Sequence, residues 1–338
     1  MTLQPVPVRQ RPLVVLLGPT AVGKSRVGIA VAKALGTDVL TADSRQVFRG
    51  MDIGMDKPTE AERQGVPHRL IDLVEPDQPF NVGLFRRAAM AEIERLYQAG
   101  KLPFVVGGTG LYVRALVRGL WDGPSADWEL RRALVREAEE RGPEHLYREL
   151  QRVDPASAER LHPRDEAKII RALEVYRLSG RPLSEAHRAH GFAEAAFRPL
   201  LIGLARDREA LYRRINARVD EQLAKGLLDE TKRLLGRGYS RELGSMKGLG
   251  YRQLSGYLAG DYGFDEAVRR LKRDTRHFAK RQLTWFRKEP GIVWLDVRDD
   301  EPVDTTANRV CASIEAFLRE LGGGAEPRRG QAPALAAC

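Results

Sequence analysis

The amino-acid sequence predicts an α/β fold, in which a core built on a parallel sheet is interrupted by an inserted helical domain. Short apolar runs at 13–17, 102–106 and 200–204 have the length and composition of buried parallel strands. They alternate with segments of helical periodicity, of which 26–35 and 80–99 are the clearest. From 122 to 197 the chain has charged helical segments and no apolar strand run, which indicates the insertion.

The stretch from Gly18 to Ser25 follows the first strand and fits the phosphate-loop pattern G-x-x-x-x-G-K-[ST]. Its backbone N–H groups and the positive end of the next helix would hold an anion. Lys24 would reach the outer phosphate, and the Ser25 hydroxyl would ligate Mg²⁺. We therefore expect a P-loop NTPase-like core that binds a diphosphate or triphosphate through Gly18, Pro19, Thr20, Ala21, Val22, Gly23, Lys24 and Ser25.

Further polar residues are expected at the same edge of the sheet, beyond the carboxyl ends of its strands. Asp43 ends the predicted strand 38–43 and could cap a helix, ligate Mg²⁺ or act as a general base. The turn Gly107-Gly-Thr-Gly110 brings the Thr109 hydroxyl to this edge. Arg214 and Arg218 lie four residues apart on one predicted helix, a spacing suited to gripping a diphosphate.

The charge of the chain indicates a polyanionic partner. The 338 residues carry a net charge of +10, and residues 269–288 hold nine basic side chains against one acid, Asp274. The segment ends with basic residues beside Trp285 and Phe286, which suits phosphate contacts with base stacking, although the aromatic rings could instead be core. We expect Arg276, Lys280 and Arg281 to contact the partner.

Other features limit the class of protein. Two cysteines, Cys311 and Cys338, form neither a disulfide framework nor a metal-binding spacing. No run is apolar and long enough to span a membrane, so we expect a cytoplasmic protein. We also expect a monomer. The turn-rich stretch 53–59 predicts an exposed Lys57. The expected domains are an α/β core at 11–121 and 198–320, a helical insertion at 122–197 and a disordered tail at 322–338.

Taken together, the motifs resemble the bacterial tRNA dimethylallyltransferases. The matching segments are GPTAVGKS (18–25), DSRQVF (43–48), GMDKPT (54–59), PHRLID (67–72), VGGTGLY (106–112), KIIRALEVYRLSGRP (168–182), GLGYRQL (248–254) and KRQLTWF (280–286). They occur in the family's order between residues 13 and 296. Phe48 stands where the family commonly has Tyr, Arg69 where a second His is common, and Met55-Asp56 where Thr-Ala is common. Any role of that Tyr hydroxyl or of that second His is therefore not carried over to this chain.

The resemblance implies transfer of a dimethylallyl group from dimethylallyl diphosphate to N6 of the adenine 3′ of the anticodon (position 37), in tRNAs that read codons beginning with U. The phosphate loop and Mg²⁺ would then hold the leaving diphosphate, and Asp43 would be the general base. The insertion would clasp the anticodon stem-loop. Family-derived tRNA contacts are expected from Asp43, Ser44, Arg45, Gln46, Thr109, Arg131, Ala167, Lys168, Ile169, Ile170 and Arg171, and from Lys247 and Arg252 in the 247–252 turn.

Two other functions are compatible with a phosphate loop. A small-molecule or nucleotide kinase would share the loop and the sheet, and would transfer a γ-phosphoryl group. An RNA-binding switch would use ATP only to change shape. A kinase has no need of a long basic helix, and a switch would leave its RNA chemically unchanged.

Overall fold

The computed structural model describes residues 11–121, 123–190 and 197–322. The chain forms two compact units. One, here called the α/β unit, takes in the chain up to Val117 and again from Ala196, and the other, the helical unit, spans Arg118–Ala195.

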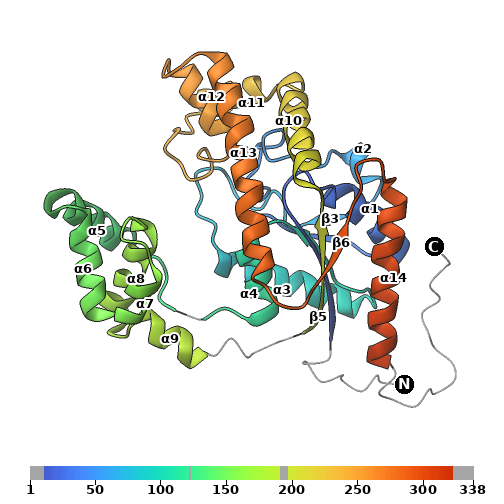
Figure 1. Cartoon of the computed structure of the whole chain (residues 1–338), viewed down its shortest axis with the longest axis horizontal. Helices are drawn as coiled ribbons and strands as arrows, with labels where there is room; N and C mark the ends of the chain where they lie inside the picture. The colour runs from blue at the N-terminus through green and yellow to red at the C-terminus, as the bar shows by residue number, and fades with distance from the viewer. Residues whose placement is uncertain (1–10, 122, 191–196, 323–338) are drawn as a thin grey trace. The chain divides into compact units, whose positions relative to one another are not determined.

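The α/β unit is built on a six-stranded parallel sheet, which confirms the predicted fold class (Figure 1). Its strands lie in the order β3-β2-β4-β1-β5-β6. The bounds are β1 Pro12–Leu17, β2 Val39–Ala42, β3 His68–Arg69, β4 Phe104–Gly107, β5 Arg198–Ala205 and β6 Ile292–Asp296. Because β1 lies between β4 and β5, the segments that follow these strands meet at one edge of the sheet.

Helices cover both faces of this sheet. Alternate residues of β1 point to opposite faces, so Val14 and Leu16 pack with one apolar core and Leu13 and Val15 with the other. The first core takes in α1 (Lys24–Leu35) and α14 (Val303–Gly322), and the second takes in α3 (Val82–Gln98) and α4 (Gly110–Arg118). Every strand of the centre is therefore buried on both sides, which is why the strand sequences are continuous apolar runs.

A third core joins the helices that follow β5 in the chain, between Arg208 and Arg287. Tyr251 is its largest fully buried side chain, packed with residues such as Met51 and Leu234. The helices α10 and α13 lie side by side (Figure 1). The bounds are α2 Glu60–Arg63, α10 Arg208–Ala224, α11 Leu227–Gly236, α12 Tyr251–Leu258 and α13 Phe264–Arg287.

The helical unit has an apolar core of its own, centred on residues such as Leu134, Leu150 and Leu173. Its helices are α5 Trp128–Arg141, α6 Pro143–Val153, α7 Pro155–Arg160, α8 Glu166–Ser179 and α9 Leu183–His190. Asp127 caps α5 by accepting hydrogen bonds from the backbone N–H groups of Glu129 and Leu130.

The expected disordered tail falls outside the described residues, apart from Gly322, which ends α14. Among the described helices, none combines the length and the apolar content that crossing a bilayer requires.

Candidate functional site

The phosphate loop, Gly18–Ser25, joins β1 to α1 and needs glycine at two positions. Gly18 and Gly23 have φ values of 150° and 112°, in the region that only glycine adopts readily. A Cβ added to Gly18 would lie 2.7 Å from the carbonyl oxygen of Leu204 on β5. The loop therefore lies directly against the end of the neighbouring strand.

Lys24 opens α1 and turns back across the loop, with its Nζ donating to the carbonyl oxygen of Pro19 at 2.7 Å. Burial lowers the pKa of Lys24 to about 8; the carboxylates of Asp43 and Asp56 act in the opposite direction, and Arg218 adds to the lowering. These three charged groups are thus close enough to act on Lys24. An anion bound in the loop would favour the protonated lysine.

Arginines hold the loop from outside. Arg214 donates from Nε to the carbonyl oxygen of Ala21 at 3.1 Å, and Arg218 donates to the Thr20 hydroxyl at 2.7 Å. Arg218 also lies 3.3 Å from the carboxylate of Asp56. A third arginine, Arg206, is not among the residues predicted from the sequence; its Nε donates to the carbonyl oxygen of Val22 at 3.1 Å. A single arginine after a strand carries no motif, so only the fold reveals this contact.

Asp43 follows β2 and faces the same edge of the sheet as the loop. Its Oδ1 accepts a hydrogen bond of 2.8 Å from the backbone N–H of Arg45, which fixes the orientation of the carboxylate. Thr109 joins this segment to the turn after β4, because its hydroxyl accepts from the backbone N–H of Ser44 at 3.0 Å. The phosphate loop, Asp43 and Thr109 therefore lie together, because each follows the carboxyl end of one of the neighbouring strands β1, β2 and β4.

The side chains next to Asp43 hold neighbouring loops. Arg45 donates to the carbonyl oxygen of Gly244 at 2.7 Å, and Gln46 donates to that of Met55 at 3.1 Å. Both side chains are therefore engaged within the protein in this structure.

A further residue at the site, Gln282 on α13, was not among the predicted site residues. Its Oε1 accepts from the backbone N–H of Thr20 at 2.8 Å, and its Nε2 donates to the carbonyl oxygen of Gly108 at 2.9 Å. It therefore joins the phosphate loop to the turn Gly107–Gly110, here called the glycine turn. The only sequence signal was its place in the segment 280–286.

The basic run of α13 divides into two halves. Cations of the first half are paired, as Lys272 is with Asp220 at 2.6 Å and Arg273 is with Asp274 at 3.0 Å. Arg269 and Arg270 both pair with Glu266. Within the described residues, no acidic partner is found for the cations of the second half, Arg276, Lys280, Arg281, Arg287 and Lys288. The excess positive charge is therefore concentrated near Gln282.

The adjacent aromatic side chains Trp285 and Phe286 of α13 differ. Phe286 is 1% exposed and belongs to the sheet core, whereas Trp285 is 37% exposed. The guanidinium of Arg114 lies over the Trp285 ring, 4.4 Å from its centroid. Of these two rings, only Trp285 is available for stacking on a base.

In the 247–252 turn, both predicted RNA contacts carry an ionic partner. Lys247 lies 3.2 Å from Glu242, and Arg252 lies 2.8 Å from Asp274. On α13, Arg276 donates to the side-chain oxygen of Asn216 at 2.7 Å.

In the helical unit, Arg131 and Arg171 converge on one buried carboxylate. Glu174 is 0% exposed and accepts from Arg131 at 2.9 and 2.8 Å and from Arg171 at 2.6 Å. Burial acts to raise the pKa of Glu174, but hydrogen bonds from Arg131, Arg171 and the Asp127 backbone outweigh it, so the pKa is lowered. Part of the charge of these arginines is thus neutralised inside the unit.

The predicted contact segment 167–171 has two kinds of residue. Ile169 and Ile170 are core side chains of the helical unit. Ala167 and Lys168 are exposed, and Lys168 pairs with Asp165. The exposed residues and Arg171 are the ones placed to meet a ligand.

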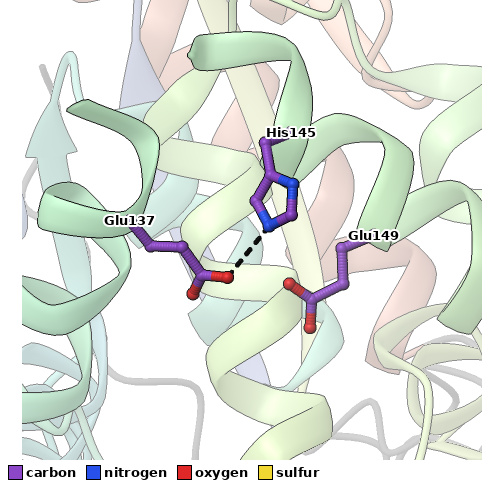
Figure 2. A group of neighbouring side chains, drawn as sticks. All are labelled: Glu137, His145 and Glu149. Carbon is purple, nitrogen blue, oxygen red and sulfur yellow. Dashed lines mark hydrogen bonds and ion pairs between the residues drawn. The ribbon is translucent and has the colours of Figure 1, made fainter. Parts of the chain in front are cut away.

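A second group of candidate ligands lies in the helical unit. Figure 2 shows His145 directed at Glu137, with Glu149 beside them; one ligand atom of each lies within 4.8 Å of the others. Arg177 pairs with Glu137 at 3.1 Å and with Glu149 at 2.8 Å. Because Arg177 pairs with both carboxylates and Arg141 lies 3.7 Å from Glu137, we interpret the group as an ion-pair network.

The expectation of an exposed Lys57 is wrong. Its side chain is 3% exposed, and its ammonium group pairs with Asp52 and Asp72 and donates to the carbonyl oxygen of Phe48 at 2.6 Å. Two carboxylates distant from each other in sequence make this burial possible, and the turn residues alone did not reveal them.

Comparisons with known proteins bear on what this site does. The family model described as IPP transferase matches residues 46–289. A tRNA dimethylallyltransferase of Pelotomaculum thermopropionicum is 48% identical over 92% of this chain and 98% of the relative. A tRNA dimethylallyltransferase 2 of Geotalea uraniireducens is 50% identical over 90% of this chain and 97% of the relative.

Solved structures agree with the sequence comparisons. The tRNA isopentenylpyrophosphate transferase of Bacillus halodurans is 38% identical, with a TM-score of 0.70 over 93% of this chain and 99% of that one. A eukaryotic dimethylallyltransferase, described as acting on tRNA, is 29% identical, with a TM-score of 0.80 over 96% of this chain and 82% of that one.

Proposed function

The chain belongs to the IPP transferase family, and we propose that it is a tRNA dimethylallyltransferase. It transfers a dimethylallyl group from dimethylallyl diphosphate to N6 of the adenine at position 37, next to the anticodon, of tRNAs that read codons beginning with U. Diphosphate is released. The observation that carries this proposal is the convergence of a phosphate loop and a backbone-oriented carboxylate, Asp43, at one sheet edge beside the basic half of α13.

The phosphate loop would bind the diphosphate. The backbone N–H groups at the start of α1 and the charge of Lys24 would meet the phosphate oxygens. The residues proposed for this role are Gly18, Pro19, Thr20, Ala21, Val22, Gly23, Lys24 and Ser25, with Arg214 and Arg218 as flanking cations. As the C–O bond breaks, these positive groups stabilise the negative charge that develops on the leaving group.

The Ser25 side chain fits a role as a Mg²⁺ ligand. It is exposed in the first turn of α1, and the described residues include no hydrogen-bond partner for its hydroxyl. An oxygen donor beside bound diphosphate matches the preference of Mg²⁺ for oxygen ligands and retained waters. When bound there, Mg²⁺ would supply charge neutralisation of the diphosphate.

Asp43 is proposed as the general base. One carboxylate oxygen is held by the Arg45 N–H, and the carboxylate is thereby oriented before the substrate arrives. N6 of the adenine attacks the allylic carbon, the C–O bond to diphosphate breaks, and Asp43 accepts the N6 proton. The adenine must leave its stack to reach this edge.

The RNA would be held by polar and cationic residues of both units. In the α/β unit we propose Ser44, Arg45, Gln46, Thr109, Lys247, Arg252, Arg276, Lys280 and Arg281. In the helical unit we propose Arg131 and the segment 167–171, through its exposed residues. We further propose that the protein acts as a monomer in the cytoplasm; light scattering of the purified chain, alone and with tRNA, tests the monomer.

The test is a transfer assay. The purified protein is incubated with unmodified tRNA, Mg²⁺ and either dimethylallyl diphosphate or ATP, and the digested nucleosides are analysed by mass spectrometry. The proposal expects a dimethylallyl mass on adenosine with the prenyl donor alone. ATP consumption without any added mass would assign the loop to a nucleotide and support a kinase.

A further inference from the structure

Gln282 uses both ends of its amide to join two loops of the site. It accepts from the backbone N–H of Thr20 at 2.8 Å and donates to the carbonyl oxygen of Gly108 at 2.9 Å. Its side chain is largely buried, at 8% exposure for the residue. Buried amide hydrogen bonds of this kind are costly to leave unmade, so the side chain has one preferred position.

The glycine turn is shaped to receive α13. A Cβ on Gly108 would lie 2.5 Å from the Gln282 Nε2, and a Cβ on Gly110 would lie 2.2 Å from the Trp285 ring. The backbone of Gly108 does not have positive φ in this structure. Its lack of a side chain therefore serves the close approach of Gln282.

Thr20 is held on two sides. Its N–H donates to Gln282, and its hydroxyl accepts from Arg218 at 2.7 Å. It lies at the end of the phosphate loop away from Lys24 and Ser25, which begin α1. A displacement of Gln282 therefore acts on the part of the loop that precedes α1, which is held by side chains such as Lys24 and Arg218 and not by helical backbone hydrogen bonds.

The neighbours of Gln282 on α13 face outward. Lys280 and Arg281 are exposed and, within the described part of the chain, have no acidic partner. RNA phosphates gathered by these cations would bind the same rigid helix whose inner side holds the two loops.

We propose that Gln282 is a positioning residue through which RNA bound on α13 and diphosphate bound in the phosphate loop alter each other's affinity. The inference rests on the proposed function, because it takes RNA and a diphosphate as the two ligands. RNA that fixes α13 fixes Gln282, which fixes Thr20 and Gly108. By thermodynamic linkage, diphosphate then tightens RNA binding by the same factor.

The experiment measures the dissociation constant of inorganic diphosphate with Mg²⁺, by calorimetry on the full chain. It is repeated with a saturating unmodified anticodon stem-loop. The ratio of the two constants is the coupling factor. For the wild-type chain we expect tightening by RNA of at least about fivefold, the lower range of measured allosteric couplings.

The variant Gln282→Met removes both hydrogen bonds with little change of volume. We expect its coupling factor to fall to within about twofold of one, with each ligand alone bound within about threefold of wild type. The matched control is Gln253→Met. Gln253 is also buried and bonded at both ends, to the Gly250 N–H and to Asp274, but it lies on α12. The control should keep its coupling, and thermal melting identifies any loss of fold.

A second pair of variants tests the geometry. Gly108→Ala places a Cβ against the Gln282 amide and should reduce the coupling to the level of Gln282→Met. The double variant combines Gly108→Ala with Gln282→Ala. Its alanine at position 282 is too short to clash with the new Cβ at position 108. The double variant should therefore couple no more weakly than Gln282→Ala alone, a non-additive result expected for groups in contact or in one hydrogen-bond network.

A coupling factor of one in the wild-type chain, or an unchanged factor in folded Gln282→Met, would overturn the inference. These outcomes are distinct from failure of the proposed function, which would appear as binding of both ligands without prenyl transfer.

Discussion

The α/β unit and the helical unit treat their charged residues in different ways. At the sheet edge, Lys24 and Asp43 are oriented by backbone groups and not by a close ion pair. In the helical unit, Arg131 and Arg171 are bound to the buried Glu174, and Arg177 joins two further carboxylates. Charges of the first kind stay fully available to a ligand, whereas part of the charge of the second kind is used to hold the unit together. Whether a charge serves a ligand or the fold therefore depends on its partner, which need not be near in sequence.

The largest effect on activity is expected for Asp43→Asn at the sheet edge. If the carboxylate serves only the ligand, its loss should lower kcat by roughly 10²–10⁴-fold, the usual contribution of a general base, with no loss of stability. The Arg45 N–H can still donate to the amide oxygen. Diphosphate affinity should stay within about twofold of wild type if measured near pH 6, where Lys24 remains protonated. A large loss of diphosphate affinity instead would make Asp43 a structural or metal-binding residue.

The opposite result is expected for Glu174→Gln in the helical unit. The change leaves two arginines without their buried carboxylate, and breaking a buried ion pair from one side destabilises by about 3–5 kcal/mol. Urea unfolding should show an earlier transition of the helical unit, while diphosphate affinity of the α/β unit is unchanged. The control is Glu140→Gln on an exposed position of α5. Equal effects of the two variants would contradict the assignment.

The stabilising contribution of Glu174 should also depend on pH. The folded-state pKa of Glu174 is lowered from 4.5, so its stabilising contribution is complete above that pH and is lost as the pH falls through the lowered value. Acid unfolding of the helical unit, followed by circular dichroism, should therefore be less steep in Glu174→Gln. An identical acid transition in both chains would show that Glu174 does not contribute.

If the charge of Lys24 binds the diphosphate, the affinity for this ligand should change with pH as Lys24 loses its proton. The pKa of Lys24 is about 8 in the free protein, and a bound anion raises it. The affinity for dimethylallyl diphosphate should be level below that pH and fall by up to about tenfold per unit above it. In Lys24→Arg the side chain stays charged, so this fall should disappear. Titration of the ligand itself affects both chains alike, and parallel profiles would refute the role of Lys24.

The same distinction explains what the sequence could predict. Strand, loop and helix follow one another at 13–35, so local chemistry was enough to place the phosphate loop and to bring Asp43 to its edge. The contacts of Gln282 with Thr20, of Arg206 with Val22 and of Lys57 with Asp72 join distant segments. No spacing rule reports such pairs. They could not be predicted because they depend on how distant loops, strand ends and helices come together in the fold.

Helix α13 contains cations without an acidic partner among the described residues and cations bonded within the protein, so single substitutions on it test the distinction through small differences in RNA binding. Lys280 is exposed and, in the described chain, unpaired, whereas Arg276 donates to Asn216 at 2.7 Å and lies near the Tyr212 ring. Charge reversal of both residues should weaken tRNA binding and flatten its salt dependence. Taken singly, Lys280→Gln should reduce the slope of log affinity against log salt by about one, because one phosphate contact is lost. Arg276→Gln should change the slope less and lower the melting temperature more, because its charge is partly used inside the protein. Filter binding across a salt series measures the slopes. Equal slopes for both variants and the wild-type chain would place the RNA elsewhere than on α13.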